Sequence, residues 1–444
     1  MGWDQDVLRA QFCHALSEMY KSEVPLYGDL VDLVWKADAE AINARHEQGT
    51  EVFDPDEILP SRNRVERHGA IRLGTAYELS TIRRMFAIMG MFPVGYYDLS
   101  AAGFPMHATA FRPWTKEALS RHPFRVFTTV LHRLVALIEL AEKQGQLSST
   151  ECKEFIVEGL ETFRWHSRAT VTMEEYQILK AEHPLIADVV SFPSCHINHL
   201  TPRTVDIDLV QKMMQDHGMP AKERIEGPPR RQCPILLRQT SFKALEETVY
   251  FREAHDAYVK GSHTARFGEV EQRGYALTRK GRQLYDRILS RVNIESTERG
   301  IGISEYESLL VQHFKDFPDD MAQLQSQQLA YFCYHLSPHG QKPPGLDLQG
   351  GDMTLQQLLE NSIIEYEPIT YEDFLPLSAG GIFNSNLGNT SQSKQLVMEA
   401  EADLDGFQRM LGTSIMDEFH LYAQIQQNSL ENCRRQLGLN VILE

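Results

Sequence analysis

Residues 266–273 read Arg-Phe-Gly-Glu-Val-Glu-Gln-Arg and lie within an extended segment, Ala265–Thr278. Because side chains alternate between the two faces of a strand, Glu269 and Glu271 share one face. If that face is buried, the two carboxylates repel each other unless a cation or a proton separates them. If it is exposed, they form the solvated face of an edge strand. The residues themselves leave both interpretations open.

Two other extended stretches place a histidine four residues before an arginine. They read His68-Gly-Ala-Ile-Arg72 and His199-Leu-Thr-Pro-Arg203. Two histidines and one carboxylate that leave coordination positions open form the ligand set of non-haem Fe(II) oxygenases. The alternative is a pair of hydrogen-bonded histidines in or beside the core, with both arginines in surface ion pairs.

The first stretch also suggests how an anionic substrate would bind. In a strand, residues i and i+4 point to the same side, about 13 Å apart, so Arg72 would lie along the same wall as His68. A guanidinium there can bind a carboxylate through two parallel hydrogen bonds. In the second stretch, Pro202 lacks a backbone N–H donor and would end the strand before Arg203. The pattern therefore favours a metal-dependent reaction on an anionic substrate.

Segments with helical periodicity surround these strands. Apolar residues recur at helical spacing in Val7–Tyr20, Asp29–His46, Tyr77–Met91, Val126–Lys143, Val205–His217 and Lys280–Val292. Further extended segments are expected at Val65–Thr75, Ile186–Phe192, Ile197–Pro202 and Pro234–Phe242. The mixture predicts an α+β fold in which a central sheet carries the motifs. We expect a single catalytic domain over residues 1–444, with a metal-binding β core at about 63–112, 186–278 and 364–390 and a mostly helical insertion at about 116–182.

Composition excludes several classes of protein. The 444 residues carry 44 basic and 61 acidic side chains, a formal net charge of −17, which argues against a nucleic-acid or anionic-membrane surface. No apolar run approaches 18 residues, so we expect no membrane-spanning segment. The acidic start, Met1-Gly-Trp-Asp-Gln-Asp6, does not resemble a signal peptide. The six cysteines form no Cys-x-x-Cys pair, which fits a cytoplasmic protein without a zinc knuckle.

Six motifs resemble those of one known family. They are Arg67-His-Gly-Ala-Ile-Arg72, His196-Ile-Asn-His-Leu-Thr-Pro-Arg203, Ile225-Glu-Gly-Pro-Pro-Arg-Arg231, Leu236-Leu-Arg-Gln-Thr-Ser-Phe-Lys243, Arg266-Phe-Gly-Glu-Val-Glu-Gln-Arg-Gly274 and Asp373-Phe-Leu-Pro-Leu-Ser-Ala-Gly-Gly-Ile-Phe383. In content and order they are similar to the 2-oxoadipate dioxygenase/decarboxylase family, also called the D-2-hydroxyglutarate synthases. The resemblance runs nearly end to end along the chain.

The resemblance implies a fold related to the vicinal oxygen chelate superfamily, in which a half-open β-barrel surrounds Fe(II). It also implies that two histidines and one glutamate bind the iron. His68 matches the first ligand. For the second, the run Asn-His-Leu-Thr-Pro-Arg favours His199 over His196. For the third, residues 267–273 are similar to a run in related oxygenases that places the ligand at Glu269, with Glu271 as the alternative.

Three residues match substrate-contacting positions of the family. Arg72 matches its substrate-binding arginine, and Leu377 and Ser378 match a pair near the carboxy-terminal end. Leu377 departs from the valine that is frequent in relatives and would narrow the substrate pocket slightly. A methylene of difference changes discrimination between substrates by only about 1–3 kcal/mol, so the departure shifts preference without abolishing binding.

The implied reaction is an Fe(II)-dependent conversion of 2-oxoadipate and O2 into 2-hydroxyglutarate and CO2, a step of lysine degradation that needs no external 2-oxoglutarate. The implied partners are therefore a small 2-oxo diacid and O2, without nucleic acid or membrane. Two alternatives stay open. One is a metal-dependent isomerase or lyase of the vicinal oxygen chelate type that acts on another 2-oxo acid. The other is a non-catalytic binding protein.

Overall fold

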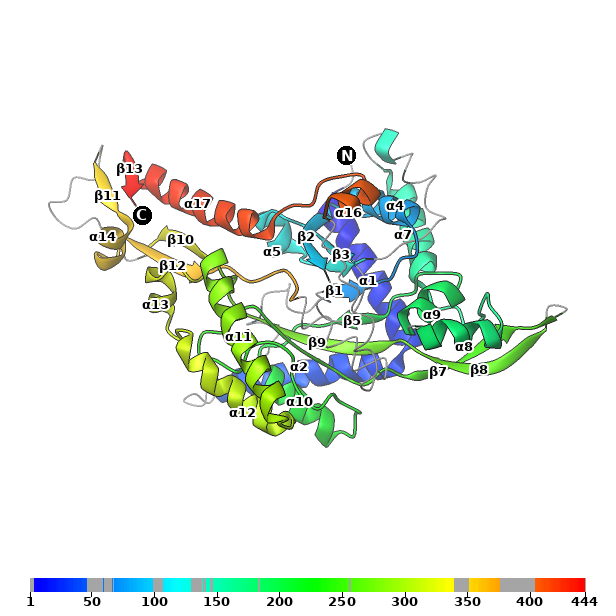
Figure 1. Cartoon of the computed structure of the whole chain (residues 1–444). Helices are drawn as coiled ribbons and strands as arrows, with labels where there is room; N and C mark the ends of the chain where they lie inside the picture. The colour runs from blue at the N-terminus through cyan, green and yellow to red at the C-terminus, as the bar shows by residue number, and fades with distance from the viewer. Residues whose placement is uncertain are drawn as a thin grey trace. The chain divides into compact units, whose positions relative to one another are not determined.

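The computed structural model describes residues 4–45, 59, 66, 68–98, 107–128, 138, 141–143, 147–182, 184–254, 257–338, 351–375 and 404–443 (Figure 1). Contacts between residues divide the chain into two compact units. The first comprises Met1–Glu226, Arg238–Gln272 and Asp373–Met416, and the second comprises Gly227–Leu237, Arg273–Glu372 and Asp417–Glu444. No helix in the described ranges is both long and apolar enough to cross a membrane.

A seven-stranded mixed sheet forms the centre of the first unit (Figure 1). Its strands are β1 (His68–Ala70), β2 (Phe92–Asp98), β3 (His107–Arg112), β4 (Arg125–Phe127), β5 (His199–Thr201), β6 (Leu237–Ser241) and β9 (Phe267–Arg273). They curl into a half-barrel in the order β2-β3-β4-β1-β5-β9-β6. β1 runs antiparallel to β5, and β5 runs parallel to β9. Three strands from distant parts of the sequence therefore lie side by side.

Six helices of the first unit pack on this sheet in one apolar core: α1 (Gln5–Glu23), α2 (Pro25–Arg45), α4 (Ala76–Ile88), α7 (Ser149–Phe163), α10 (Ile207–Asp216) and α16 (Leu404–Leu411). Two further helices, α8 (Met173–Glu182) and α9 (Pro184–Ser191), contribute to a second, smaller apolar cluster, and α5 (Lys116–Arg121) is a short helix between β3 and β4. Strands β7 (Glu246–Arg252) and β8 (Tyr258–Thr264) form a separate antiparallel ribbon. Capping side chains mark helix starts: Asp4 accepts two backbone N–H groups at α1, and Thr75 with Glu78 forms a capping box at α4.

Two contacts fix the ends of β5 and β9 against the first two helices. The hydroxyl of Tyr20 in α1 lies 2.9 Å from the carbonyl oxygen of Asn198 and 2.8 Å from that of Phe267. A Cβ at Gly268 would lie 2.5 Å from Cε1 of Phe242 and 2.9 Å from Cδ2 of Tyr27 in α2. Only glycine therefore lets β9 approach α2 this closely. These contacts hold the strands that carry two of the candidate metal ligands.

The second unit is mostly helical. It contains α11 (Arg279–Arg299), α12 (Ile303–His313), η4 (Phe314–Asp316), α13 (Met321–Ser326), α14 (Leu355–Glu360) and α17 (Glu418–Leu437). Its short strands are β10 (Phe332–Leu336), β11 (Asp352–Thr354), β12 (Ile364–Pro368) and β13 (Val441–Leu443). Strand β10 pairs with β12, and β11 pairs with β13. Gly300 ends α11 in a left-handed conformation, with φ of 60°.

The predicted α+β class is confirmed. The helices expected at 7–20, 29–46, 77–91, 205–217 and 280–292 are also confirmed and correspond to α1, α2, α4, α10 and α11. One extended segment was predicted wrongly. Residues 186–191 of that segment fall in α9, where Leu185, Asp188 and Ser191 are buried at helical spacing. A short run rich in β-branched residues does not distinguish a strand from a buried helix. The helix expected at 126–143 is also wrong at its start, because Val126 and Phe127 belong to β4; most of its remainder lies outside the described residues.

Candidate metal centre

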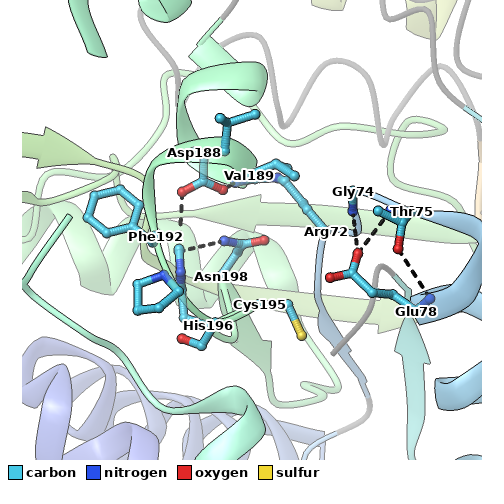
Figure 2. Close-up of a pocket in the computed structure, with 13 residues that line it drawn as sticks. Arg72, Gly74, Thr75, Glu78, Asp188, Val189, Phe192, Cys195, His196 and Asn198 are labelled. Atoms are coloured by element: carbon cyan, nitrogen blue, oxygen red, sulfur yellow. Dashed lines mark hydrogen bonds and ion pairs between the residues drawn. The ribbon is translucent and has the colours of Figure 1, made fainter. Parts of the chain in front are cut away.

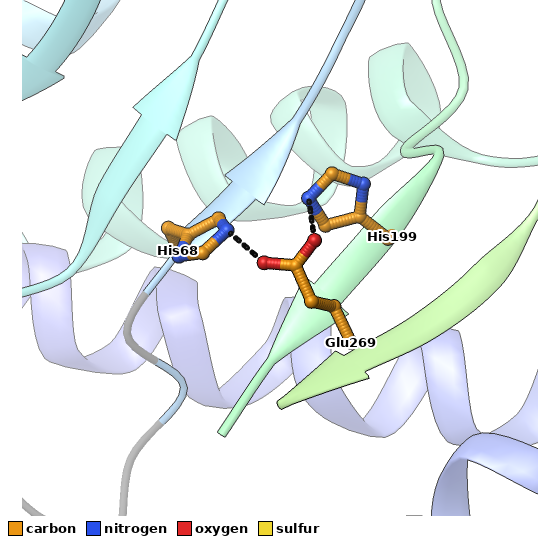
Figure 3. A group of neighbouring side chains, drawn as sticks. All are labelled: His68, His199 and Glu269. Carbon is orange, nitrogen blue, oxygen red and sulfur yellow. Dashed lines mark ion pairs between the residues drawn. The ribbon is translucent and has the colours of Figure 1, made fainter. Parts of the chain in front are cut away.

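Three neighbouring strands bring His68, His199 and Glu269 together (Figure 3). One ligand atom from each residue lies within 4.8 Å of the other two. Nε2 of His68 is 3.0 Å from Oε1 of Glu269, and Nε2 of His199 is 3.9 Å from Oε2. All three side chains are buried. The strands β1, β5 and β9 thus point two imidazoles and one carboxylate at one place.

The chemistry of these donors suits a divalent metal ion. Burial lowers the pKa of His199 to about 3, so its imidazole is neutral near pH 7. Its Nδ1 is buried and has no hydrogen-bond partner among the described residues. Burial alone would raise the pKa of Glu269, but His199, His68 and Lys222 hold it below its ordinary value. A neutral imidazole and an ionised carboxylate are the forms that bind metals.

Glu271 explains how His68 would be held as a ligand. Oε2 of Glu271 lies 2.9 Å from Nδ1 of His68, and Nη2 of Arg125 is 3.9 Å from Oε1 of Glu271. When His68 carries its proton on Nδ1, that N–H donates a hydrogen bond to Glu271. The lone pair of Nε2 then faces Oε1 of Glu269, 3.0 Å away. Two ligand atoms about 2.1 Å from one ion and at a right angle to each other lie about 3.0 Å apart. The spacing of Nε2 and Oε1 therefore suits two ligands of one cation.

The same geometry separates the two glutamates that the sequence left as alternatives. The imidazole of His68 lies between them, with Glu269 at Nε2 and Glu271 at Nδ1. Only Glu269 also faces His199. The solvated edge-strand interpretation is wrong, because β9 lies between β5 and β6 and Glu269 and Glu271 are 1% and 0% exposed.

Side chains that sequence reasoning missed complete the surroundings of Glu269. The hydroxyl of Thr201 is 3.4 Å from Oε1 of Glu269, and the side-chain amide of Gln239 donates to the same oxygen. Burial lowers the pKa of Lys222 to about 8, and its charge interacts with Glu269. Gln239 stands within a motif that the sequence offered, at 236–243, whereas Lys222 carries no sequence signal.

Two aromatic rings close the apolar sides of the centre. The ring of Phe374 lies edge-on to His68, with centroids 4.8 Å apart, and that of Phe267 stacks on His199 at 4.7 Å. Apolar walls exclude water and strengthen the electrostatic interactions inside. Leu377 and Ser378, which match substrate contacts in the resembling family, lie outside the described residues.

Arg72 and His196 lie together in a neighbouring cavity of about 380 Å³ (Figure 2). Strand β1 ends at Ala70, so Arg72 follows the strand instead of lying along its wall. Its Nη1 donates to the carboxylate of Asp188 in α9. Nε2 of His196 is 3.3 Å from Oδ1 of Asp188, so His196 faces this cavity and is not one of the three clustered ligands.

Replacing Glu271 with glutamine should weaken metal binding without removing a ligand. The neutral amide no longer stabilises the His68 N–H as a carboxylate does, and loss of such a supporting group typically costs about 10- to 100-fold in metal affinity. Titration of the metal-free protein with Mn(II) or Co(II) measures the change. Glu246→Gln, an exposed strand residue, serves as the control. Equal affinities for both variants would show that Glu271 has no such role.

Comparison with known proteins gives consistent matches along nearly the whole chain. Residues 12–134 and 130–386 match the family model described as 2-oxoadipate dioxygenase/decarboxylase. The 2-oxoadipate dioxygenase/decarboxylase of Escherichia coli (strain K12) is 48% identical over 453 residues, which cover 96% of this chain and 98% of the relative. The match to the protein of that name from Pseudomonas putida is 47% over 461 residues, covering 98% and 97%.

Two solved structures are similar over nearly their full length. The hydroxyglutarate synthase of Pseudomonas putida in complex with 2-oxoadipate has 43% identity and a TM-score of 0.83, and the match covers 99% of each chain. The uncharacterised protein YdcJ from Shigella flexneri has 44% identity and a TM-score of 0.79, covering 97% of this chain and 100% of that one.

Proposed function

This chain belongs to the 2-oxoadipate dioxygenase/decarboxylase family, and we propose that it converts 2-oxoadipate and O2 into 2-hydroxyglutarate and CO2. The observation that carries the proposal is the buried cluster of His68, His199 and Glu269, in a chain so similar to a synthase that binds 2-oxoadipate. The reaction balances: one carboxyl carbon leaves as CO2, and both atoms of O2 enter the five-carbon product.

Fe(II) is the metal that we propose for this centre. Two imidazoles and one carboxylate leave coordination positions for a chelating 2-oxo acid and for O2. When bound, iron supplies Lewis acidity, a template for the substrate and the change of redox state that O2 chemistry needs. The residues proposed as ligands are His68, His199 and Glu269, all of them in the first unit.

The chain's own residues would orient and shield this chemistry. Glu271 keeps the proton of His68 on Nδ1, and Thr201 and Gln239 hold Oε1 of Glu269. Phe267 and Phe374 exclude water beside the imidazoles. Fixed groups of this kind lower the barrier because they need no rearrangement during reaction.

Substrate recognition is proposed to rest on Arg72, with Leu377 and Ser378 as further contacts. A 2-oxo diacid has one carboxylate beside the keto group and another at its far end. A buried guanidinium binds such a carboxylate through two hydrogen bonds. An electrostatic interaction between Arg72 and His199, one of the proposed ligands, supports this role.

The reaction itself gives a direct test. With Fe(II), air and 2-oxoadipate, the protein is expected to consume O2 and to form 2-hydroxyglutarate and CO2 without added 2-oxoglutarate. Under 18O2, mass spectrometry should find both labelled atoms in 2-hydroxyglutarate. Chelation should stop turnover, and Fe(II) should restore it where Zn(II) does not, because Zn(II) has no accessible second redox state.

Anaerobic assays provide the control. Consumption of 2-oxoadipate that proceeds equally well without O2, or with Zn(II) in place of iron, would contradict the dioxygenase and support a metal-dependent isomerase or lyase. Binding of 2-oxoadipate to the iron-loaded protein without any turnover would support a non-catalytic role.

A further inference from the structure

Asp188 is a buried carboxylate that contacts side chains from three parts of the chain, of which Figure 2 shows Arg72 and His196. Its Oδ2 accepts a hydrogen bond from Nη1 of Arg72. Its Oδ1 lies 2.8 Å from Nε2 of His263 on β8 and 3.3 Å from Nε2 of His196. All four residues are 7% exposed or less. One carboxylate thus connects the proposed substrate-binding arginine to two histidines outside the metal centre.

Tyr176 in α8 fixes the orientation of this carboxylate through His263. The Tyr176 hydroxyl is 2.9 Å from Nδ1 of His263. The ionised carboxylate of Asp188 can only accept, so His263 donates to it from Nε2. In the neutral imidazole Nδ1 is then the acceptor, and the Tyr176 hydroxyl donates to it. The ring of Phe192, centred 4.7 Å from that of His263, limits rotation of the imidazole.

The position of Arg72 makes this anchoring relevant to the substrate. Arg72, Asp188, His196 and Asn198 line one cavity, and Asn198 directly precedes the proposed ligand His199 in the chain. A guanidinium carries five N–H donors in one plane, so its orientation determines where a second carboxylate can bind. Asp188 contacts one edge of that plane.

We propose that Asp188 is a positioning residue for substrate binding, which holds the Arg72 guanidinium in the plane that a substrate carboxylate requires. The chain from Tyr176 through His263 to Asp188 fixes that plane from outside the metal centre. The proposal rests on the substrate-binding role proposed above for Arg72. It assigns Asp188 no contact with the substrate and no role in holding the metal.

A double-mutant cycle tests this. Asp188→Asn keeps the shape of the side chain but removes its charge. It is expected to raise KM for 2-oxoadipate by about 10- to 100-fold, the cost of a misplaced binding group, with a smaller change in kcat. In the background of Arg72→Gln, the same substitution should change kcat/KM by less than about threefold, because no guanidinium is left to position. Iron content should be unchanged in every variant.

Asp38→Asn is the matched control. Asp38 is also a buried aspartate, but it accepts hydrogen bonds from Thr204 and Val205 at 2.6 and 2.9 Å. Its replacement should lower the melting temperature and leave KM unchanged. If Asp188→Asn does not fold, Tyr176→Phe removes only the distant hydroxyl. That variant should raise KM by a few-fold in the native background and leave it unchanged beside Arg72→Gln.

Three outcomes would overturn the proposal. If Asp188→Asn lowers kcat/KM equally in the native and the Arg72→Gln backgrounds, Asp188 has a general structural role and does not act through Arg72. A lower KM would show that Asp188 only competes with the substrate for the guanidinium. Unchanged kcat/KM in Arg72→Gln alone would instead locate the failure in the role of Arg72 itself.

Discussion

Replacing His199 with alanine should remove the metal and nearly all turnover. The imidazole of His199 is buried, neutral and 3.9 Å from Glu269. Metal binding in small four-ligand zinc sites is worth about 10–16 kcal/mol, so one ligand contributes about 3 kcal/mol, or roughly 100-fold or more in affinity. Metal content after dialysis and the rate of 2-hydroxyglutarate formation measure the two effects.

Two further alanine variants serve as controls for this experiment. His14→Ala removes an exposed helical histidine and should keep both metal and activity. His196→Ala should keep the metal, because His196 lies against Asp188 and not beside Glu269. Full metal content in His199→Ala together with loss of metal in His196→Ala would reverse the ligand assignment.

Replacing Arg72 with alanine should reduce kcat/KM for 2-oxoadipate while leaving the metal in place. Truncation of one partner of a buried, hydrogen-bonded charge pair costs about 2–5 kcal/mol, or roughly 30- to several-thousand-fold. Arg72→Lys keeps the charge but loses the planar guanidinium, so its kcat/KM should lie between that of the native protein and that of Arg72→Ala. Steady-state kinetics with parallel iron analysis measures the change.

A monoacid of the same length shows which carboxylate Arg72 binds. 2-Oxohexanoate lacks the distal carboxylate of 2-oxoadipate. If Arg72 binds that carboxylate, its replacement should hardly affect turnover of 2-oxohexanoate. If Arg72 binds the carboxylate beside the keto group, its replacement should lower kcat/KM equally for both substrates. Unchanged kinetics on both would contradict any role of Arg72 in substrate binding.

The metal centre shows what could be predicted from the sequence. The extended segments around His68, His199 and Glu269 followed from residue patterns, but the pairing of β1, β5 and β9 did not. Strand order depends on contacts between distant residues, which local periodicity does not encode. The period-two rule placed Glu269 and Glu271 on one face correctly, yet it could not show that the imidazole of His68 lies between them.

The surroundings of Arg72 were harder to predict for two physical reasons. The strand rule for residues i and i+4 failed because β1 ends at Ala70. The position of Asp188 was not predicted, because its segment was expected to be extended, whereas in α9 the side chain is buried. The family resemblance supplied the metal, the reaction and the ligand assignments, none of which composition or spacing could provide alone.

The Tyr20 contact bears on how the protein is synthesised. Its two acceptor carbonyls lie 178 and 247 residues further along the chain, and His68 is separated from Glu271 by 203 residues. Ribosomes release the chain from its amino terminus, so α1 emerges long before the strands that it must meet. Contacts of such long range form slowly. The cluster of His68, His199 and Glu269 therefore cannot form until β9 has emerged, and a metal ion can be held there only after that point in synthesis.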